Sequence, residues 1–227
     1  MKKSDKFDLP SFMRKCIRDF VRIVSENLEI SEPIYEFGAL QPLDQKEFAD
    51  LRPFFPGKQY VGCDYQAGPG VDKVLDLHDL RVPSESIGTA LCLETLEHVE
   101  FPRKAMDEMH RILSPTGISV ISSVMNFPIH EHPSDYWRFT PEGLKSLLKS
   151  FPVSFSYAAG DEYFPHTVVS VAFKSSSNLP AKFKEHMDQW EKRWKFENGN
   201  TIRERLKLLL PPALSDLGRK IKKTACS

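Results

Sequence analysis

The sequence predicts a parallel, doubly wound α/β sheet with an antiparallel hairpin at one edge, together with N- and C-terminal helices. Three observations lead to this fold class. Short apolar runs alternate with helix-like periods between residues 31 and 179, and two further strand-like runs follow without a helix between them. Of the 227 residues, 41% are hydrophobic and 27% charged, which is the balance of a globular protein with a large core. Strands that alternate with helices are typical of parallel sheets with right-handed crossovers.

Seven runs have the length and the β-branched or apolar content of strands. The first five are PIYEFG (33–38), QYVGCD (59–64), DKVLDL (72–77), IGTALCLE (87–94) and GISVISSV (117–124). The last two, 153–159 and 166–174, are joined by a loop too short for a helix. We therefore expect these two to form the antiparallel hairpin.

Helices are predicted over residues 44–55, 101–114 and 140–151. The second places Ala105, Met109 and Ile112 on one apolar stripe and is followed by Ser-Pro-Thr-Gly, a stop signal. The third begins with Thr140 as its N-cap and Pro141 at the first helical position.

Charge is distributed unevenly, although 31 basic residues balance 31 acidic ones. Residues 31–179 carry 12 basic and 20 acidic side chains, whereas residues 180–227 carry 12 and 6. The sign changes at a Ser-, Asn- and Pro-rich stretch, 175–180, where chains often leave compact structure. We therefore expect an N-terminal helical segment (1–30), a central domain (31–179) and a basic helical extension (180–227).

The composition also disfavours several classes of protein. An acidic central domain in a chain of zero net charge disfavours nucleic acid as a partner. The four cysteines form no CxxC pair, the N-terminus lacks the apolar run of a signal peptide, and no stretch has the apolar length of a membrane span. We expect a cytoplasmic protein with reduced thiols.

Polar residues end four of the predicted strands, and an open α/β sheet places its ligand crevice at such ends. They are Glu36 with Gly38, Asp64, Asp76 and Glu94. An acid after the second strand suits a ribose diol, because a carboxylate accepts two hydroxyl hydrogen bonds; alternatively, Asp64 only begins a turn. A lone Gly38 instead of G-x-G-x-x-G disfavours a pyrophosphate cofactor and favours a nucleoside without phosphate.

A longer string, VLDLHDLRVPSESIGTALCLETLEHVEFPRKAMDEMHRILSPTGISVIS (74–122), combines an acid before a short loop, a strand followed by L-E-H-V, and a helix closing in R-x-L-x-P-x-G. In this order the elements resemble class I S-adenosylmethionine-dependent methyltransferases of the type 11 group, over about residues 34–148. The resemblance implies a Rossmann-like fold and S-adenosyl-L-methionine as the cofactor.

The resemblance also implies cofactor-binding positions, which match the residues that end the predicted strands. These are Glu36 and Gly38 in the first motif, Asp64 at the ribose, Tyr65 beside the adenine, Asp76 and Leu77 at the adenine edge, and Glu94 facing the methionyl part. The chain departs from the family in two places. Ala39-Leu40-Gln41 replaces the later glycines of the first motif, and a loop over 66–70 replaces the helix after the second strand.

Candidate catalytic residues lie in two segments. His98 follows the fourth strand. There it would serve as general base for a hydroxyl acceptor; alternatively, it packs at the start of the next helix. After the fifth strand, Tyr136 and Trp137 would form an apolar wall, and Arg138 would offer a fork to a carboxylate or phosphate. In the alternative, the aromatic residues of this segment pack the loop on the sheet.

The same loop contains His130 and His132 on either side of Glu131. No third ligand lies at a definable spacing, so we expect no metal site.

These observations predict a methyltransferase that acts on a small-molecule or sugar-containing acceptor. The alternative is a non-catalytic S-adenosylmethionine-binding or assembly module, because the first motif is degenerate. Leu206, Leu209 and Leu217 recur at helical spacing among basic residues of the extension. We expect this extension to dock on the body or on a second copy in a homodimer, in preference to an anionic membrane surface.

Overall fold

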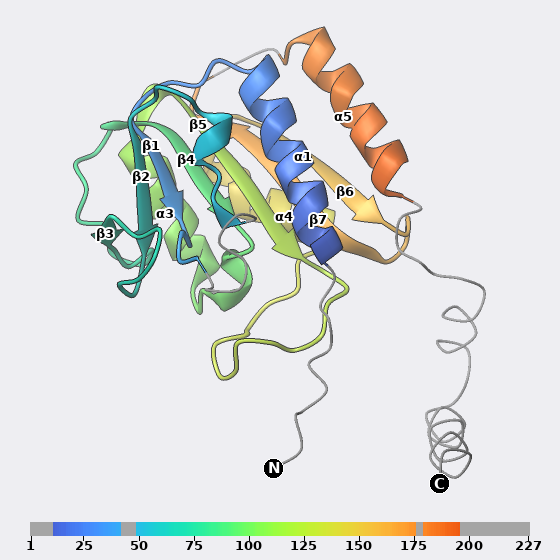
Figure 1. Cartoon of the computed structure of the whole chain (residues 1–227), viewed down its shortest axis with the longest axis horizontal. Helices are drawn as coiled ribbons and strands as arrows, with labels where there is room; N and C mark the ends of the chain where they lie inside the picture. The colour runs from blue at the N-terminus through green and yellow to red at the C-terminus, as the bar shows by residue number, and fades with distance from the viewer. Residues whose placement is uncertain (1–10, 42–48, 176–178, 196–227) are drawn as a thin grey trace, which may run out of the picture.

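A single mixed sheet of seven strands forms the centre of the computed structural model, which describes residues 11–41, 49–175 and 179–195 (Figure 1). The strand order is β3-β2-β1-β4-β5-β7-β6. The strands are β1 (Ile34–Phe37), β2 (Tyr60–Asp64), β3 (Lys73–Val74), β4 (Ile87–Leu93), β5 (Leu113–Val124), β6 (Val153–Gly160) and β7 (Pro165–Phe173).

The pairing of the strands confirms the predicted fold class. Strands β1 to β5 pair in parallel, whereas β7 runs antiparallel between β5 and β6. The strand order reverses between β1 and β4, so the carboxyl ends of these two strands border the crevice where ligands bind in open α/β sheets. All residues of β4 and β7 are buried, which explains their nearly continuous apolar runs.

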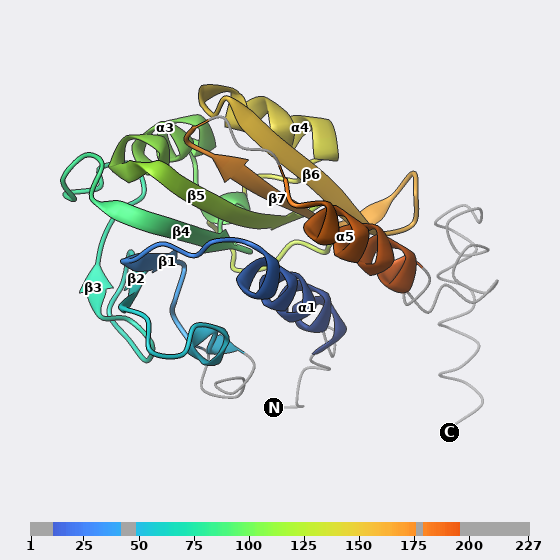
Figure 2. The same ribbon diagram turned by 90° about the horizontal axis from the view of Figure 1, so that it is seen from above.

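Helices cover both faces of the sheet (Figure 2). Helices α1 (Ser11–Asn27) and α5 (Ala181–Trp194) lie side by side on one face, and α3 (Pro102–Ile112) and α4 (Pro141–Leu147) lie on the other. The described part of the chain also contains three 3₁₀ turns: η1 (Arg52–Phe54), η2 (Leu96–His98) and η3 (Leu148–Ser150). Each face buries its own hydrophobic cluster.

Helix α5 is fastened to α1 by two tryptophans. Trp190 is 1% exposed and donates its indole N–H to the carbonyl of Cys16 at 2.9 Å, while Trp194 donates to Asp19 Oδ2 at 3.0 Å. Both rings join the hydrophobic cluster that α1 forms with the sheet. The predicted amphipathic segments around Leu206, Leu209 and Leu217 lie outside the described residues.

The element ends predicted from local sequence patterns agree with the structure at some positions and differ at others. Thr140 is the N-cap of α4, because its hydroxyl accepts the Gly143 N–H at 2.9 Å. The helix expected over 44–55 falls partly outside the described residues, and its described end forms the short turn η1, where Pro53 cannot donate an amide to a preceding turn. Strand β3 ends at Val74 rather than at residue 77, because residues 76–79 close a tight turn with Asp79 N–H on the Asp76 carbonyl at 3.0 Å.

None of the helices in the described ranges has the length and apolar content needed to cross a lipid bilayer. Cys63 and Cys92 are fully buried thiols, and burial raises the pKa of each above its ordinary value. Neither thiol is therefore poised as a nucleophile.

Candidate functional site

The loop after β1 approaches the loop after β4 so closely that only glycine fits at its first position. Gly38 has a φ of 86°, and a Cβ on it would lie 2.0 Å from Thr95 Oγ1. That hydroxyl lies 2.9 Å from the carbonyl of Leu93 and 3.2 Å from that of Phe37. The backbone at the carboxyl ends of β1 and β4 is thereby held together at the point where the strand order reverses.

Asp64 ends β2 beside this loop and is 8% exposed. Its Oδ2 accepts the Leu40 N–H at 3.3 Å, and its Oδ1 accepts the Gln66 N–H at 3.2 Å. Burial raises the pKa of the carboxyl, and these amide donors lower it. Asp64 therefore joins the first two crevice loops and keeps a carboxylate that can accept further bonds.

The two departures from the family motif compensate for each other. Leu40 stands where the resemblance would place a motif glycine. Its side chain lies so close to Gly68 that a Cβ on Gly68 would be 2.3 Å from it. The Gln41 N–H donates to the Pro69 carbonyl at 2.9 Å. Because Gly68 on the facing loop has no side chain, Leu40 fits against it without a clash.

The carboxyl of Glu36 is hydrogen-bonded within the protein. It is 7% exposed, and its Oε2 accepts the Tyr60 hydroxyl at 2.7 Å. Burial raises the pKa of Glu36 to about 7. The guanidinium of Arg52 stacks over the Tyr60 ring at 5.2 Å and binds Asp72 at 2.8 Å, so charge lies close to this carboxyl.

The turn after β3 is organised by a histidine that the sequence analysis did not single out. The Asp76 Oδ1 accepts the backbone N–H of His78 at 2.8 Å and lies 2.8 Å from its Nδ1, and the backbone bond lowers the pKa of Asp76. Since His78 Nε2 accepts the Phe101 N–H at 3.2 Å, its Nδ1 carries the proton. Leu77 is 8% exposed and packs in the core, whereas Tyr65, on the preceding loop, is 73% exposed.

Glu94 directly follows β4 in a left-handed backbone conformation, with φ of 50°. Its N–H lies 3.1 Å from the carbonyl and 3.0 Å from the hydroxyl of Ser122 on β5. Such conformations cost about 1–3 kcal/mol in non-glycine residues and cluster at functional sites.

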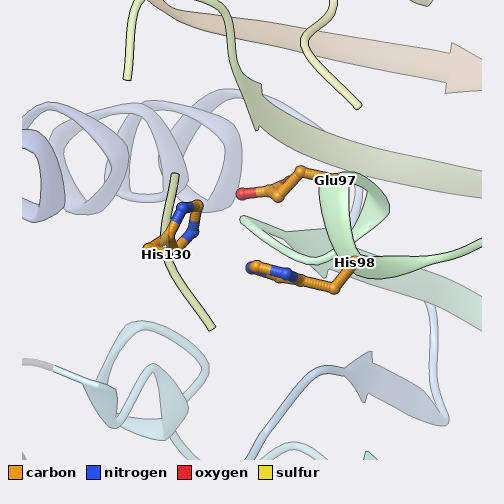
Figure 3. Close-up of side chains that lie close together, drawn as sticks. All are labelled: Glu97, His98 and His130. Atoms are coloured by element: carbon orange, nitrogen blue, oxygen red, sulfur yellow. The ribbon is translucent and has the colours of Figure 1, made fainter. Parts of the chain in front are cut away.

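Two residues further, the turn η2 brings Glu97 and His98 towards the loop after β5 (Figure 3). Glu97 is fully buried; its Oε2 accepts the Ser123 hydroxyl at 2.7 Å, and burial raises its pKa. The rings of His98 and His130 meet edge to face, with centroids 4.6 Å apart. His98 thus lies against the loop of residues 125–139 rather than packing only at the start of α3.

Arg138 braces that loop with all of its donors. Its five N–H groups meet both oxygens of Asp135, at 2.6 and 2.7 Å, and the carbonyls of Phe127, Pro128 and Trp137. The guanidinium in turn holds the pKa of Asp135 well below its usual range. In this arrangement Arg138 positions the loop and presents no fork to a ligand.

The two aromatic residues before Arg138 are anchored by their backbone and half exposed. The N–H groups of Tyr136 and Trp137 both donate to the Glu97 carbonyl, at 2.8 and 3.1 Å. Their side chains are 46% and 43% exposed, while Phe139 is buried. Phe139 therefore packs in the core, whereas the other two rings are half exposed, and the apolar wall expected from them stays a prediction.

Two surface hollows lie away from the strand ends. One, of about 360 Å³, is bordered by α4 and β6, and the other, of about 270 Å³, lies between α1 and α5. Neither is lined by a residue of the crevice described above.

Comparison with known proteins identifies the central region. Residues 51–121, from η1 to β5, match the methyltransferase domain family. Over these residues the chain is similar to methyltransferase domains. The matched part contains Asp64, Asp76, Leu77, Glu94 and His98 and stops short of the loop braced by Arg138. No curated protein matches the sequence.

Solved structures of methyltransferases share the fold of this chain. A SAM-dependent methyltransferase from Archaeoglobus fulgidus has a TM-score of 0.55 at 13% identity, over 70% of this chain and 94% of that one. The 1,6-didemethyltoxoflavin-N1-methyltransferase of Burkholderia thailandensis, with bound 1,6-didemethyltoxoflavin and S-adenosylhomocysteine, has a TM-score of 0.54 at 19% identity, over 76% and 82%. The chain therefore has the Rossmann-like fold that class I methyltransferases share.

A chain from the complex of the Haloferax volcanii Trm112 methyltransferase activator with a methyltransferase is also similar, with a TM-score of 0.54 at 14% identity, over 74% of this chain and 92% of that one. At such identities the likeness concerns the fold alone.

Sequence reasoning missed three residues that organise the candidate site: His78, Glu97 and Asp135. Glu97 could have been noticed as an acid directly before His98, and Asp135 as an acid three residues before Arg138. The bond between His78 and Phe101 had no signal in the sequence, because only the fold brings these two residues together.

Proposed function

We propose that the protein transfers a methyl group from S-adenosyl-L-methionine to a small-molecule acceptor. The observation that carries this proposal is the position of Asp64. It places a carboxylate at the carboxyl end of β2, next to the strand-order reversal, and inside the region that matches the methyltransferase family.

The chemistry of the crevice fits this cofactor. Asp64 would hold the ribose diol, since two backbone amides occupy only part of the acceptor capacity of its carboxylate. Asp76 keeps one oxygen beyond its bonds to His78, and with Leu77 it would read the adenine edge beside Tyr65. Glu94 would face the methionyl part of the cofactor. Gly38 would allow the cofactor to approach the backbone closely, and Glu36 would support strand β1.

The cofactor supplies an activated methyl group on a sulfonium, so the protein has mainly to align the reacting atoms and exclude water. His98 stands on the acceptor side, where its Nδ1 donates to the Ser134 carbonyl at 2.7 Å and leaves Nε2 as the basic nitrogen. Such a nitrogen suits removal of a proton from a hydroxyl acceptor.

The rim of the crevice supports a small organic acceptor. Tyr136 and Trp137 offer half-exposed rings from the loop after β5. The β6–β7 turn begins at the same edge, because Met125 and Asn126 donate to the carbonyls of His166 and Pro165, and it adds exposed Tyr163. Aromatic walls with few polar groups are typical of small-molecule sites, and the similar Burkholderia enzyme is named for such an acceptor.

A second candidate is a module that binds the cofactor without turnover, and the replacement of a motif glycine by Leu40 favours it. Isothermal titration separates the candidates in part, because a protein that binds no S-adenosylmethionine cannot be the proposed enzyme. Binding must then be followed by transfer of labelled methyl to an extract of small metabolites, and the absence of any labelled product would favour the non-catalytic module.

The decisive variant is Asp64→Ala. Charge-assisted bonds from a diol are worth roughly 1.5–3 kcal/mol each, so we expect at least a tenfold loss of cofactor affinity. Asp188→Ala is the matched control. Asp188 is exposed on α5, so this substitution removes the same charge at a position away from the crevice. Unchanged affinity in a folded Asp64→Ala protein would remove Asp64 from the site and with it the main support of the proposal.

A further inference from the structure

Glu97, His98 and His130 converge on one point, although they come from two segments of the chain. Glu97 and His98 extend from the turn η2 and His130 from the loop after β5, and Figure 3 shows their polar ends facing one another. A ligand atom from each of the three side chains lies within 4.8 Å of a ligand atom from each of the others. Two imidazoles and a carboxylate form a donor set that zinc and related ions prefer.

The remaining polar atoms of the two histidines are fixed by the protein. His98 donates from Nδ1 to the Ser134 carbonyl at 2.7 Å, and His130 Nδ1 lies 3.2 Å from the Pro128 carbonyl and 3.3 Å from Asp135 Oδ2. Metal-binding histidines are held in this way, because a bond at one nitrogen orients the ring and sets the tautomer that leaves the other nitrogen basic. The Nε2 atoms are therefore the ones available for a ligand.

The carboxyl of Glu97 provides a second, independent observation. Its Oε2 accepts the Ser123 hydroxyl at 2.7 Å, whereas Oε1 has no hydrogen-bond partner among the residues that the structure describes. The side chain is 0% exposed, so this oxygen is shielded from bulk solvent. A buried oxygen without a partner is costly, and a bound cation offsets this cost directly.

We propose that Glu97, His98 and His130 bind a divalent transition-metal ion of the zinc type. Zinc bonds of about 2.0–2.2 Å place tetrahedral ligands roughly 3.4 Å apart, so the cluster would have to close by little more than about 1 Å. Magnesium and calcium fit less well, because they prefer oxygen ligands throughout. Three protein ligands leave one position of the ion for water or a further ligand.

The ion would join two parts of the acceptor side. Glu97 also accepts the N–H groups of Tyr136 and Trp137 through its carbonyl, so a metal at its carboxylate would add a second tie between η2 and the loop of residues 125–139. If the proposed methyl transfer is correct, the open position would receive an acceptor hydroxyl, whose proton would pass to solvent water before its oxygen takes the methyl group from the sulfonium. His98 would then act as a ligand in place of a base.

The test uses the full chain without an affinity tag, stripped of metal by a chelator and titrated with zinc sulfate in a calorimeter. We expect one ion per chain, a higher melting temperature with zinc, and visible absorption bands of tetrahedral cobalt when Co²⁺ replaces zinc. His130→Ala and Glu97→Gln should each weaken zinc binding at least tenfold, because even the loss of an outer partner costs that much. His132→Ala is the matched control, since this exposed histidine lies two residues away in the same loop.

Two results would overturn the proposal: no stoichiometric zinc binding by the full chain, or binding that His130→Ala and Glu97→Gln leave unchanged. If Glu97→Gln fails to fold, the cobalt spectrum of the parent protein and of His130→Ala still decides. The outcome is separate from the proposed function, because zinc binding is measured without cofactor or acceptor, and S-adenosylmethionine binding is measured without zinc.

Discussion

Replacing Gly38 by alanine tests whether the close approach of the β1 and β4 loops stabilises the crevice. The backbone at Gly38 has a φ of 86°, which costs a residue with a Cβ roughly 1–2 kcal/mol. The added Cβ would also lie 2.0 Å from Thr95 Oγ1, so this hydroxyl must leave its bonds to the strand ends. Forcing a methyl group into a packed site costs about 1–3 kcal/mol more. We expect a total near 3.5 kcal/mol.

Gly57 offers a matched control. Its φ is 73°, but nothing lies within 4 Å of where its Cβ would be, so Gly57→Ala carries the backbone cost alone. In urea unfolding we expect about 1.5 kcal/mol for Gly57→Ala and about 3.5 kcal/mol for Gly38→Ala. At 2–4 °C per kcal/mol, the second change lowers the melting temperature by about 10 °C.

A double-mutant cycle with Thr95→Ala isolates the steric part. Without Oγ1, the nearest Thr95 atom to the new methyl group is Cβ, at 3.0 Å, so Gly38→Ala should cost about 2 kcal/mol less in this background than in the parent. Additive effects of the two substitutions, or equal effects of Gly38→Ala and Gly57→Ala, would refute the reasoning.

Three further predictions concern individual side chains. Burial raises the pKa of Glu36 from 4.5 to about 7, so its contribution to stability is complete below about pH 4.5 and is lost as the pH rises through 7. Glu36→Gln should therefore gain stability relative to the parent by up to roughly 3 kcal/mol between pH 5 and pH 8 in urea unfolding, and a pH-independent difference would contradict this. Arg138→Lys cannot replace five N–H bonds and should speed proteolytic cleavage within residues 127–138, whereas Arg81→Lys, at a side chain 86% exposed, should not; equal cleavage rates would exclude the brace. His98→Ala should lower single-turnover methyl transfer by about 10²–10⁴-fold with little change in cofactor affinity, and normal transfer with a large fall in melting temperature would assign His98 to packing.

The fold was largely predictable because its signals are local. Apolar runs such as IGTALCLE define buried strands, and Thr140 with Pro141 defines the start of α4, without reference to distant residues. The hairpin of β6 and β7 followed from the length of one short loop. The end of β3 was missed although its cause is also local, because Asp76 and His78, two residues apart, bind each other in the tight turn at residues 76–79.

The same distinction between local and tertiary information applies to the candidate site. The sequence by itself determined which residues stand at the strand ends, including Asp64 and Glu94, because strand ends follow from hydrophobic pattern. Only the tertiary structure decided that Arg138 spends its donors on the loop and that His130, rather than its neighbour His132, meets His98 and Glu97. These partners are 26 or more residues apart or lie in a loop without periodicity, and hydrogen bonds and buried charges depend on distances in space that no local pattern encodes.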